Sequence, residues 1–133
     1  MRLAALAFVA LVATGCMGRT ANDHGEDKAA PATALEISVT PGGDAPTKLW
    51  TLRCPSGGGT LPEAARACER LAQINDPFAP APKGAACTQV YGGPQEADVR
   101  GVYRGRPVKA HFDRGNGCEI ARWDKVAFLF PSA

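Results

Sequence analysis

The sequence lacks a strong excess of charge of either sign. It has 15 Lys and Arg against 13 Asp and Glu in 133 residues, which gives a formal net charge of +2. Basic residues do cluster near the carboxyl end, but acidic residues lie among them, as expected of a solvated hairpin face: Arg100, Arg104, Arg106 and Lys109 with Glu96, Asp98 and Asp113. This balance does not indicate a nucleic-acid partner.

Long hydrophobic runs are also absent. The apolar run from Leu3 to Val12 is too short for an ordinary bilayer span and follows Arg2, a pattern typical of a signal peptide. It continues into a segment that resembles the bacterial lipobox, Leu11-Val12-Ala13-Thr14-Gly15-Cys16. We therefore expect an exported protein with a lipoprotein-type signal peptide over residues 1–15 and a lipid on Cys16, which would anchor it to the outer face of the cell membrane. The alternative is an ordinary signal peptide, cleaved after Gly15 or further on.

The cysteine count agrees with a lipid on Cys16. Five cysteines in an exported protein leave one unpaired, and assigning Cys16 to lipid leaves four, enough for two disulfides: Cys54, Cys68, Cys87 and Cys118. Residues 16–33 are polar and small, which predicts a flexible tether. Residues 34–133 then form one domain, of a size at which a hydrophobic core alone is marginal and exported proteins add disulfides.

Catalytic and cofactor motifs are missing as well. Ser56 lacks the Gly-x-Ser-x-Gly frame of a nucleophile elbow, and His111 lies on the polar side of a predicted strand, where a structural or solvated role is favoured. No cluster of His, Cys or carboxylate residues has metal-ligand spacing. The glycine triplet at 57–59 has no Gly-Lys-Ser/Thr ending and indicates a turn. We therefore predict no enzyme, metal or cofactor.

Alternating apolar residues predict strands. The alternation covers Leu35–Val39, Lys48–Cys54, Ala97–Arg104 and Val108–Asp113, and Val126–Phe130 is apolar enough for a last strand. The result is an α+β fold with a sheet of about five antiparallel strands.

One helix is clear from the sequence. Thr60-Leu61-Pro62-Glu63 matches a capping box, which predicts a helix that runs to about Asn75 and ends before Pro77. Its predicted core face carries Ala64, Cys68, Leu71 and Ala72. Cys118 to Trp123 is ambiguous between a short helix and an extended run.

The segment from Cys87 to Pro94 is the most informative part of the chain. It reads as a short exposed peptide with a cysteine at its amino-terminal side and Gly92-Gly93-Pro94 at the other, and a second cysteine follows in Asn116-Gly117-Cys118. A loop fixed in extended form by a disulfide can enter another protein's substrate cleft without losing much conformational entropy. This pattern suggests an inhibitor of proteases.

Several blocks of residues together carry a family resemblance. From about Leu49 to Pro131 the chain resembles the Streptomyces subtilisin inhibitor family of serine protease inhibitors. The matching blocks are Leu52-Arg53-Cys54-Pro55, Gly58-Gly59-Thr60, Ala67-Cys68, Cys87-Thr88, Tyr91-Gly92-Gly93-Pro94-Gln95, Gly101-Val102-Tyr103-Arg104-Gly105, Asn116-Gly117-Cys118-Glu119-Ile120 and Arg122-Trp123-Asp124.

The resemblance implies a fold and an assembly. It implies a five-stranded antiparallel sheet with two helices, a homodimer, and disulfides Cys54–Cys68 and Cys87–Cys118. The first pair agrees with the residue pattern, since a cysteine at a strand end can meet one on the core face of the next helix. For the second pair the pattern offers only the two remaining cysteines.

The resemblance also implies a reactive site. It places Gln89 at P1 and Val90 at P1′, so Gln89–Val90 would be the scissile bond. The residues expected to support the loop or contact the protease are Cys87, Thr88, Tyr91, Asn116 and Cys118, with the Asn116 amide holding the loop from beneath. The implied partners are extracellular subtilisin-like proteases; a neutral P1 side chain makes trypsin-like enzymes poor targets. The alternative is a non-inhibitory cell-surface lipoprotein that uses the same scaffold as a binding module.

Overall fold

A computed structural model describes residues 32–131 of the chain. The expected signal peptide, Cys16 and most of the expected tether lie outside these residues. Thr33, which the sequence interpretation placed at the end of the tether, begins the first strand and is only 5% exposed. The folded part therefore begins slightly earlier than residue 34.

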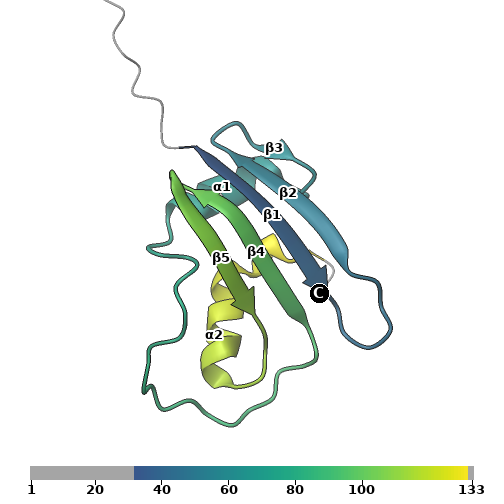
Figure 1. Ribbon diagram of the computed structural model, residues 1–133, viewed down its shortest axis with the longest axis vertical. Helices are drawn as coiled ribbons and strands as arrows, with labels where there is room; N and C mark the ends of the chain where they lie inside the picture. Colours follow the sequence, from purple (N-terminus) through teal and green to yellow (C-terminus); the bar gives the residue numbers. More distant parts are fainter. Residues whose placement is uncertain (1–31, 132–133) are drawn as a thin grey trace, which may run out of the picture.

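Five strands form one antiparallel sheet in the order β3-β2-β1-β4-β5 (Figure 1). The strands are β1 (Thr33–Thr40), β2 (Lys48–Cys54), β3 (Gly58–Gly59), β4 (Glu96–Tyr103) and β5 (Arg106–Phe112). The α+β fold with a five-stranded antiparallel sheet is confirmed, and four of its strands coincide closely with the predicted ones.

Two helices cover one face of the sheet, which gives a two-layer molecule (Figure 1). They are α1 (Ala64–Ala72) and α2 (Gly117–Val126), and α2 leads into the short 3-10 helix η1 (Ala127–Leu129). The core lies between the layers and is made of alternate strand residues and the inner faces of the helices: Leu35, Ile37, Val39, Leu52, Leu61, Ala67, Leu71, Ala97, Val99, Ala110, Phe112, Trp123, Val126, Leu129 and Phe130.

The strand predicted at Val126–Phe130 is wrong. This segment finishes α2 and forms η1, and Leu129 and Phe130 are buried in the core. The Phe130 ring lies 4.6 Å from the Trp123 ring and 5.2 Å from the Phe112 ring, measured between centroids. An apolar run of this length does not distinguish a strand from a buried helical turn, and tertiary packing decides.

The fifth strand is β3, in the glycine-rich stretch that the sequence interpretation assigned to a turn. Gly59 pairs with Leu52 and Gly58 with Arg53 at the edge of the sheet. Gly59 has φ +110°, and a Cβ there would meet the main chain of Thr51, so only glycine fits.

The predicted capping box is also wrong. The Thr60 hydroxyl accepts a hydrogen bond from Thr51 N at 3.0 Å, across to β2, and Thr60 N donates to Thr51 Oγ1 at 3.1 Å. Helix α1 begins only at Ala64, after Glu63 in a left-handed conformation with φ 51° and no side-chain cap. It ends at Ala72, not Asn75, and Ala72 is exposed, whereas Cys68 packs against the core as predicted.

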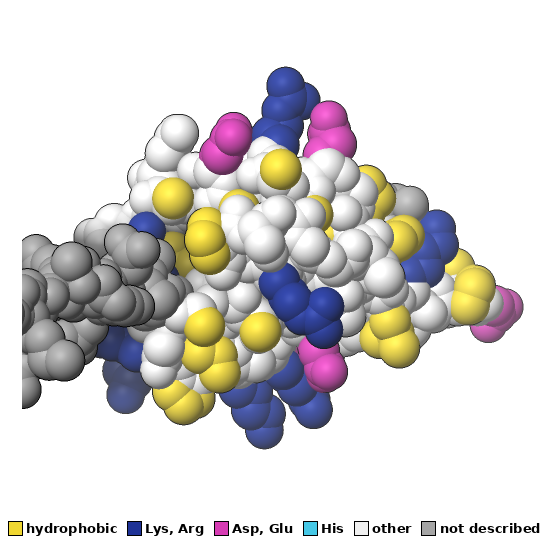
Figure 2. Space-filling model, turned by 90° about the horizontal axis from the view of Figure 1, so that it is seen from above, with side chains coloured by type: hydrophobic (Ala, Val, Ile, Leu, Met, Phe, Trp, Pro, Cys, Tyr) yellow, Lys and Arg dark blue, Asp and Glu magenta, His cyan; other side chains and the backbone are white. Residues whose placement is uncertain are grey.

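The surface carries both signs of charge. Figure 2 shows basic and acidic side chains on one face, with hydrophobic atoms in small separate patches among them. On the open face of the sheet His111 Nδ1 lies 3.1 Å from Asp98 Oδ1, and both side chains are about half exposed. Within residues 32–131 the structure contains no helix long and apolar enough to cross a bilayer.

Candidate functional site: the loop between Cys87 and Gly92

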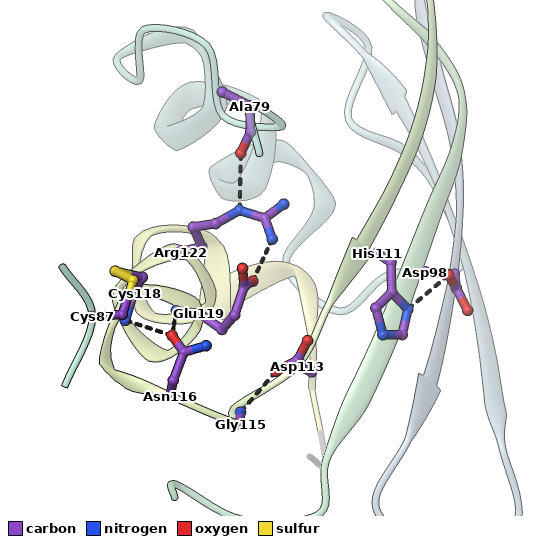
Figure 3. Close-up of polar contacts among 10 residues, drawn as sticks. All are labelled: Ala79, Cys87, Asp98, His111, Asp113, Gly115, Asn116, Cys118, Glu119 and Arg122. Atoms are coloured by element: carbon purple, nitrogen blue, oxygen red, sulfur yellow. Dashed lines mark hydrogen bonds and ion pairs between the residues drawn. A yellow bond between two sulfur atoms is a disulfide. The ribbon is translucent and has the colours of Figure 1, made fainter. Parts of the chain in front are cut away.

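A long connection runs from α1 to β4 and passes around α2 (Figure 1). Side chains of α2 hold its first part. Lys125 Nζ donates to Asn75 O at 3.2 Å. Arg122 Nε donates to Ala79 O at 2.9 Å (Figure 3). Arg122 also pairs with Glu119, and this pair is largely shielded from solvent, with side chains 16% and 19% exposed. Helix α2 therefore holds the first part of this connection in place.

A disulfide fixes the amino-terminal side of the exposed loop. Cys87 is bonded to Cys118 in the first turn of α2, with the two Cα atoms 5.3 Å apart (Figure 3). The other disulfide joins Cys54 at the end of β2 to Cys68 in α1, with Cα atoms 5.6 Å apart. Both pairs are those that the family resemblance implied.

Hydrogen bonds to its main chain hold the loop on both sides of Gln89–Val90. On one side Gly117 N donates to Thr88 O at 2.9 Å. On the other, Gly92 N donates to Arg114 O at 2.7 Å, and Arg114 Nε donates to Gly92 O at 3.1 Å. The clamped residues Thr88 and Gly92 thus bracket three loop residues.

The bracketed residues point to solvent. Gln89 is exposed, and Val90 and Tyr91 keep 56% and 69% of their surface accessible, unusual values for large apolar side chains. The Gln89 amide makes one long hydrogen bond back to Cys87 O, at 3.4 Å. An exposed peptide held in place at both ends can pair its free main-chain groups with a strand of another protein.

Residues 30–116 match the model of the family described as Subtilisin inhibitor-like. The chain belongs to this family. Among its relatives, "Subtilisin inhibitor" of Streptomyces violaceus is 34% identical over 125 residues, which cover 88% of this chain and 84% of that protein. "Transglutaminase-activating metalloprotease inhibitor" of Streptomyces mobaraensis is 32% identical over 106 residues, 74% of this chain and 71% of that protein.

The chain is also similar to a protein of known structure. That structure is the complex of Streptomyces caespitosus sermetstatin with Bacillus licheniformis subtilisin, and the match has 22% sequence identity and a TM-score of 0.47. It covers 77% of this chain and 99% of the other.

Asn116 of this subtilisin inhibitor-like chain lies at the start of α2, and its implied role in holding the loop stays a prediction. Its side-chain oxygen accepts hydrogen bonds from Cys118 N at 2.9 Å and from Glu119 N at 3.1 Å (Figure 3). It is therefore the N-cap of α2. The described hydrogen bonds to the loop come from its neighbours Gly117 and Arg114.

Sequence reasoning missed three residues that support the loop. A Cβ on Gly117 would collide with Thr88 Oγ1, which shows how closely the start of α2 approaches the loop. A Cβ on Gly92 would lie 2.8 Å from Ile120 Cδ1, which shows that Ile120 packs directly beneath the loop. Gly117 and Ile120 lie in a block that carried the family resemblance, which was the available signal. Arg114 lies in no such block and gave no signal.

The residues considered for catalysis do not form a catalytic arrangement. Ser56 Oγ donates to Arg53 O at 3.4 Å, and His111 pairs with Asp98. Between residues 32 and 131, no group of three His, Cys, Asp or Glu side chains is placed to hold a metal ion.

Proposed function

We propose that this protein inhibits serine proteases of the subtilisin type by presenting the loop from Cys87 to Tyr91 as a substrate, with Gln89–Val90 as the scissile bond. One observation carries the proposal. The exposed residues Gln89 and Val90 lie between two sets of restraints, the Cys87–Cys118 disulfide with Gly117 N on one side and Arg114 on the other. Family membership supports the same function.

Restraint of the loop explains how a short peptide can bind tightly. A flexible peptide loses conformational entropy when it docks, whereas this loop has lost much of it on folding. In the complex, the main chain around Gln89 pairs with strands of the protease, Thr88 occupies the S2 pocket, and Val90 and Tyr91 lie on the primed side. An interface of standard size, about 1,600 Å², then supports nanomolar or tighter binding.

The same restraints explain inhibition rather than digestion. The protease serine attacks the carbonyl carbon of Gln89 and forms an ester, and Val90 N leaves as an amine. Because both new ends stay attached to the folded body, the amine remains beside the ester and can reform the peptide bond. Resynthesis competes with hydrolysis and with release.

Gln89, the proposed P1 residue, determines which class of protease the protein inhibits. Its neutral amide cannot pair with the acidic residue in a trypsin-like S1 pocket, so tight binding to trypsin is not expected. A broad and largely apolar S1 pocket, as in subtilisin-like enzymes, accepts glutamine with some loss of affinity.

The test is a titration of subtilisin and of trypsin with the purified protein. We expect stoichiometric loss of subtilisin activity and weak inhibition of trypsin. If neither enzyme is inhibited, the alternative function, a non-inhibitory surface lipoprotein with a binding role, replaces this one. Hydrolase activity of the protein itself would favour an enzyme.

Export, lipidation and dimerisation complete the proposal and are tested separately. The lipobox-like segment supports a lipid on Cys16 and a location on the outer face of the cell membrane. Mass spectrometry of the mature amino terminus tests this, because a diacylglycerol adds a defined mass. Family membership supports the homodimer, which sedimentation equilibrium tests.

A further inference from the structure

Arg114 is the residue whose contacts converge on the carboxyl-terminal half of the loop. It lies between β5 and α2 and is bonded to Gly92 through two different groups, its main-chain oxygen and its Nε. Its Nη1 lies 3.2 Å from Asp124 Oδ1, and its guanidinium carbon lies 5.8 Å from the centre of the Trp123 ring. The side chain is 23% exposed, so it is held in place from several directions.

We propose that Arg114 is a positioning residue that keeps the new amine at Val90 beside the acyl-enzyme, and so decides whether the loop behaves as an inhibitor or as a substrate. This inference rests on the proposed function. It assigns the two halves of the cut loop to different supports: the Cys87–Cys118 disulfide and Gly117 hold the acyl half, and Arg114 holds the amine half.

The chemistry makes the amine half decisive. In the forward step the Gln89–Val90 bond breaks, a new ester bond joins the protease serine oxygen to Gln89, and the serine proton passes through the protease histidine to Val90 N. In resynthesis the Val90 amine attacks the ester, the peptide bond reforms and the serine recovers its proton. Water is the competing nucleophile, and it hydrolyses the ester when the amine is displaced.

Arg114 sets how far the amine can move. With Gly92 held, only Val90 and Tyr91 lie between the amine and its anchor. If both bonds to Gly92 were lost, the next residue paired in the sheet would be Glu96, opposite Thr40, and the free segment would grow from two residues to six. Effective concentration falls roughly as the −3/2 power of length, so complete loss of the hold would lower the resynthesis rate relative to hydrolysis by at most about fivefold.

The experiment measures the ratio of cut to intact inhibitor. Wild type and variants are incubated with a catalytic amount of subtilisin until the ratio is constant, and the two forms are separated chromatographically after reduction. Arg114→Ala removes the Nε bond to Gly92 O but keeps the main-chain bond from Gly92 N to Arg114 O. We therefore expect the ratio to rise by less than this fivefold limit, with inhibited subtilisin recovering activity over time. The initial association rate should stay within about twofold, because the exposed residues are unchanged.

Two further variants make the test specific. Arg114→Lys keeps the charge, but one ammonium cannot serve both Gly92 O and Asp124, so its ratio should be intermediate. Arg104→Ala is the matched control. Arg104 lies in the turn between β4 and β5, and its guanidinium also donates to a main-chain oxygen, that of Ala72, at 3.1 Å. Its ratio should equal that of wild type. Thermal unfolding checks that each variant is folded.

Each outcome is decisive. An unchanged ratio in folded Arg114→Ala and Arg114→Lys, or an equal rise in Arg104→Ala, overturns the role of Arg114 while wild-type inhibition stands. Wild-type protein that neither inhibits subtilisin nor is cut at Gln89–Val90 overturns the proposed function and this inference with it.

Discussion

Gly117 N donates to Thr88 O at 2.9 Å, and this contact joins the first turn of α2 to the residue just before Gln89. A Cβ at position 117 would collide with Thr88 Oγ1, so a side chain there would force the Thr88 hydroxyl to shift. The proposed P2 residue therefore lies close against the first turn of α2, held there by a main-chain hydrogen bond.

Gly117→Ala should weaken inhibition. The added methyl group forces the Thr88 hydroxyl to shift, and an off-rotamer side chain of this kind costs about 0.5 to 1.5 kcal/mol, or roughly 2- to 12-fold in the inhibition constant for subtilisin. In a Thr88→Ala background the same change should cost less, because the hydroxyl that it meets is gone. An equal loss in both backgrounds would show that the contact with Thr88 is not the cause.

The two disulfides should have separable effects. Each contributes about 3 to 4 kcal/mol to the free energy of unfolding on the chain-entropy model. Replacing Cys87 and Cys118 by Ser should also weaken subtilisin binding by roughly 10- to 100-fold, because the loop must then be ordered on docking. Replacing Cys54 and Cys68 by Ser is the matched control, which should lower stability and spare affinity. Equal affinity losses in the two folded variants would contradict a specific role for Cys87–Cys118.

Substitutions of Asn116 distinguish two roles of its side chain: capping of α2 by the oxygen and support of the loop by the NH2 group. If its oxygen alone matters, as the hydrogen bonds to Cys118 N and Glu119 N indicate, Asn116→Asp should keep both stability and inhibition. Asn116→Ala should lose about 1 kcal/mol of unfolding free energy, or roughly 5 °C in the melting temperature. Calorimetry and the inhibition constant check this. Weak inhibition by a stable Asn116→Asp variant would instead restore the predicted role of the amide donors.

Gln89→Lys should convert the specificity. A lysine at P1 pairs with the acidic residue of a trypsin-like S1 pocket, and such buried charge pairs support a gain of about a hundredfold or more in trypsin affinity. The same lysine at position 90, in Val90→Lys, should give no such gain. Trypsin inhibition constants for both variants provide the measurement, and no gain from Gln89→Lys would remove Gln89 from the P1 position.

Much of the fold follows from residue pattern, and the exceptions have physical reasons. Leu35, Ile37 and Val39 alternate with polar residues because one face of β1 is buried, so a strand was predictable. Thr60 resembled a helix cap, but its hydroxyl is used by Thr51 on a neighbouring strand. Gly58–Gly59 is a strand only because β2 offers an edge to pair with. These choices depend on tertiary contacts, which local patterns do not contain.

The candidate site also contains residues that the sequence predicted and residues that it did not. Cys87 and Cys118 were assigned from family blocks in the sequence, Gln89 was assigned from its position after Cys87, and the disulfide is confirmed. Arg114 was missed because its role comes from the meeting of a turn after β5 with a loop before β4. An arginine in a mixed-charge region carries no local signal of such a contact.

The most direct test of the account is to map the bond that the protease cuts. Purified protein is incubated with catalytic subtilisin at neutral pH, and the fragments are identified by mass spectrometry before and after reduction. The account predicts one cut, between Gln89 and Val90, with the two fragments joined through Cys87–Cys118 until the disulfide is reduced. Cuts at other bonds, or complete digestion with no lasting loss of protease activity, would contradict it.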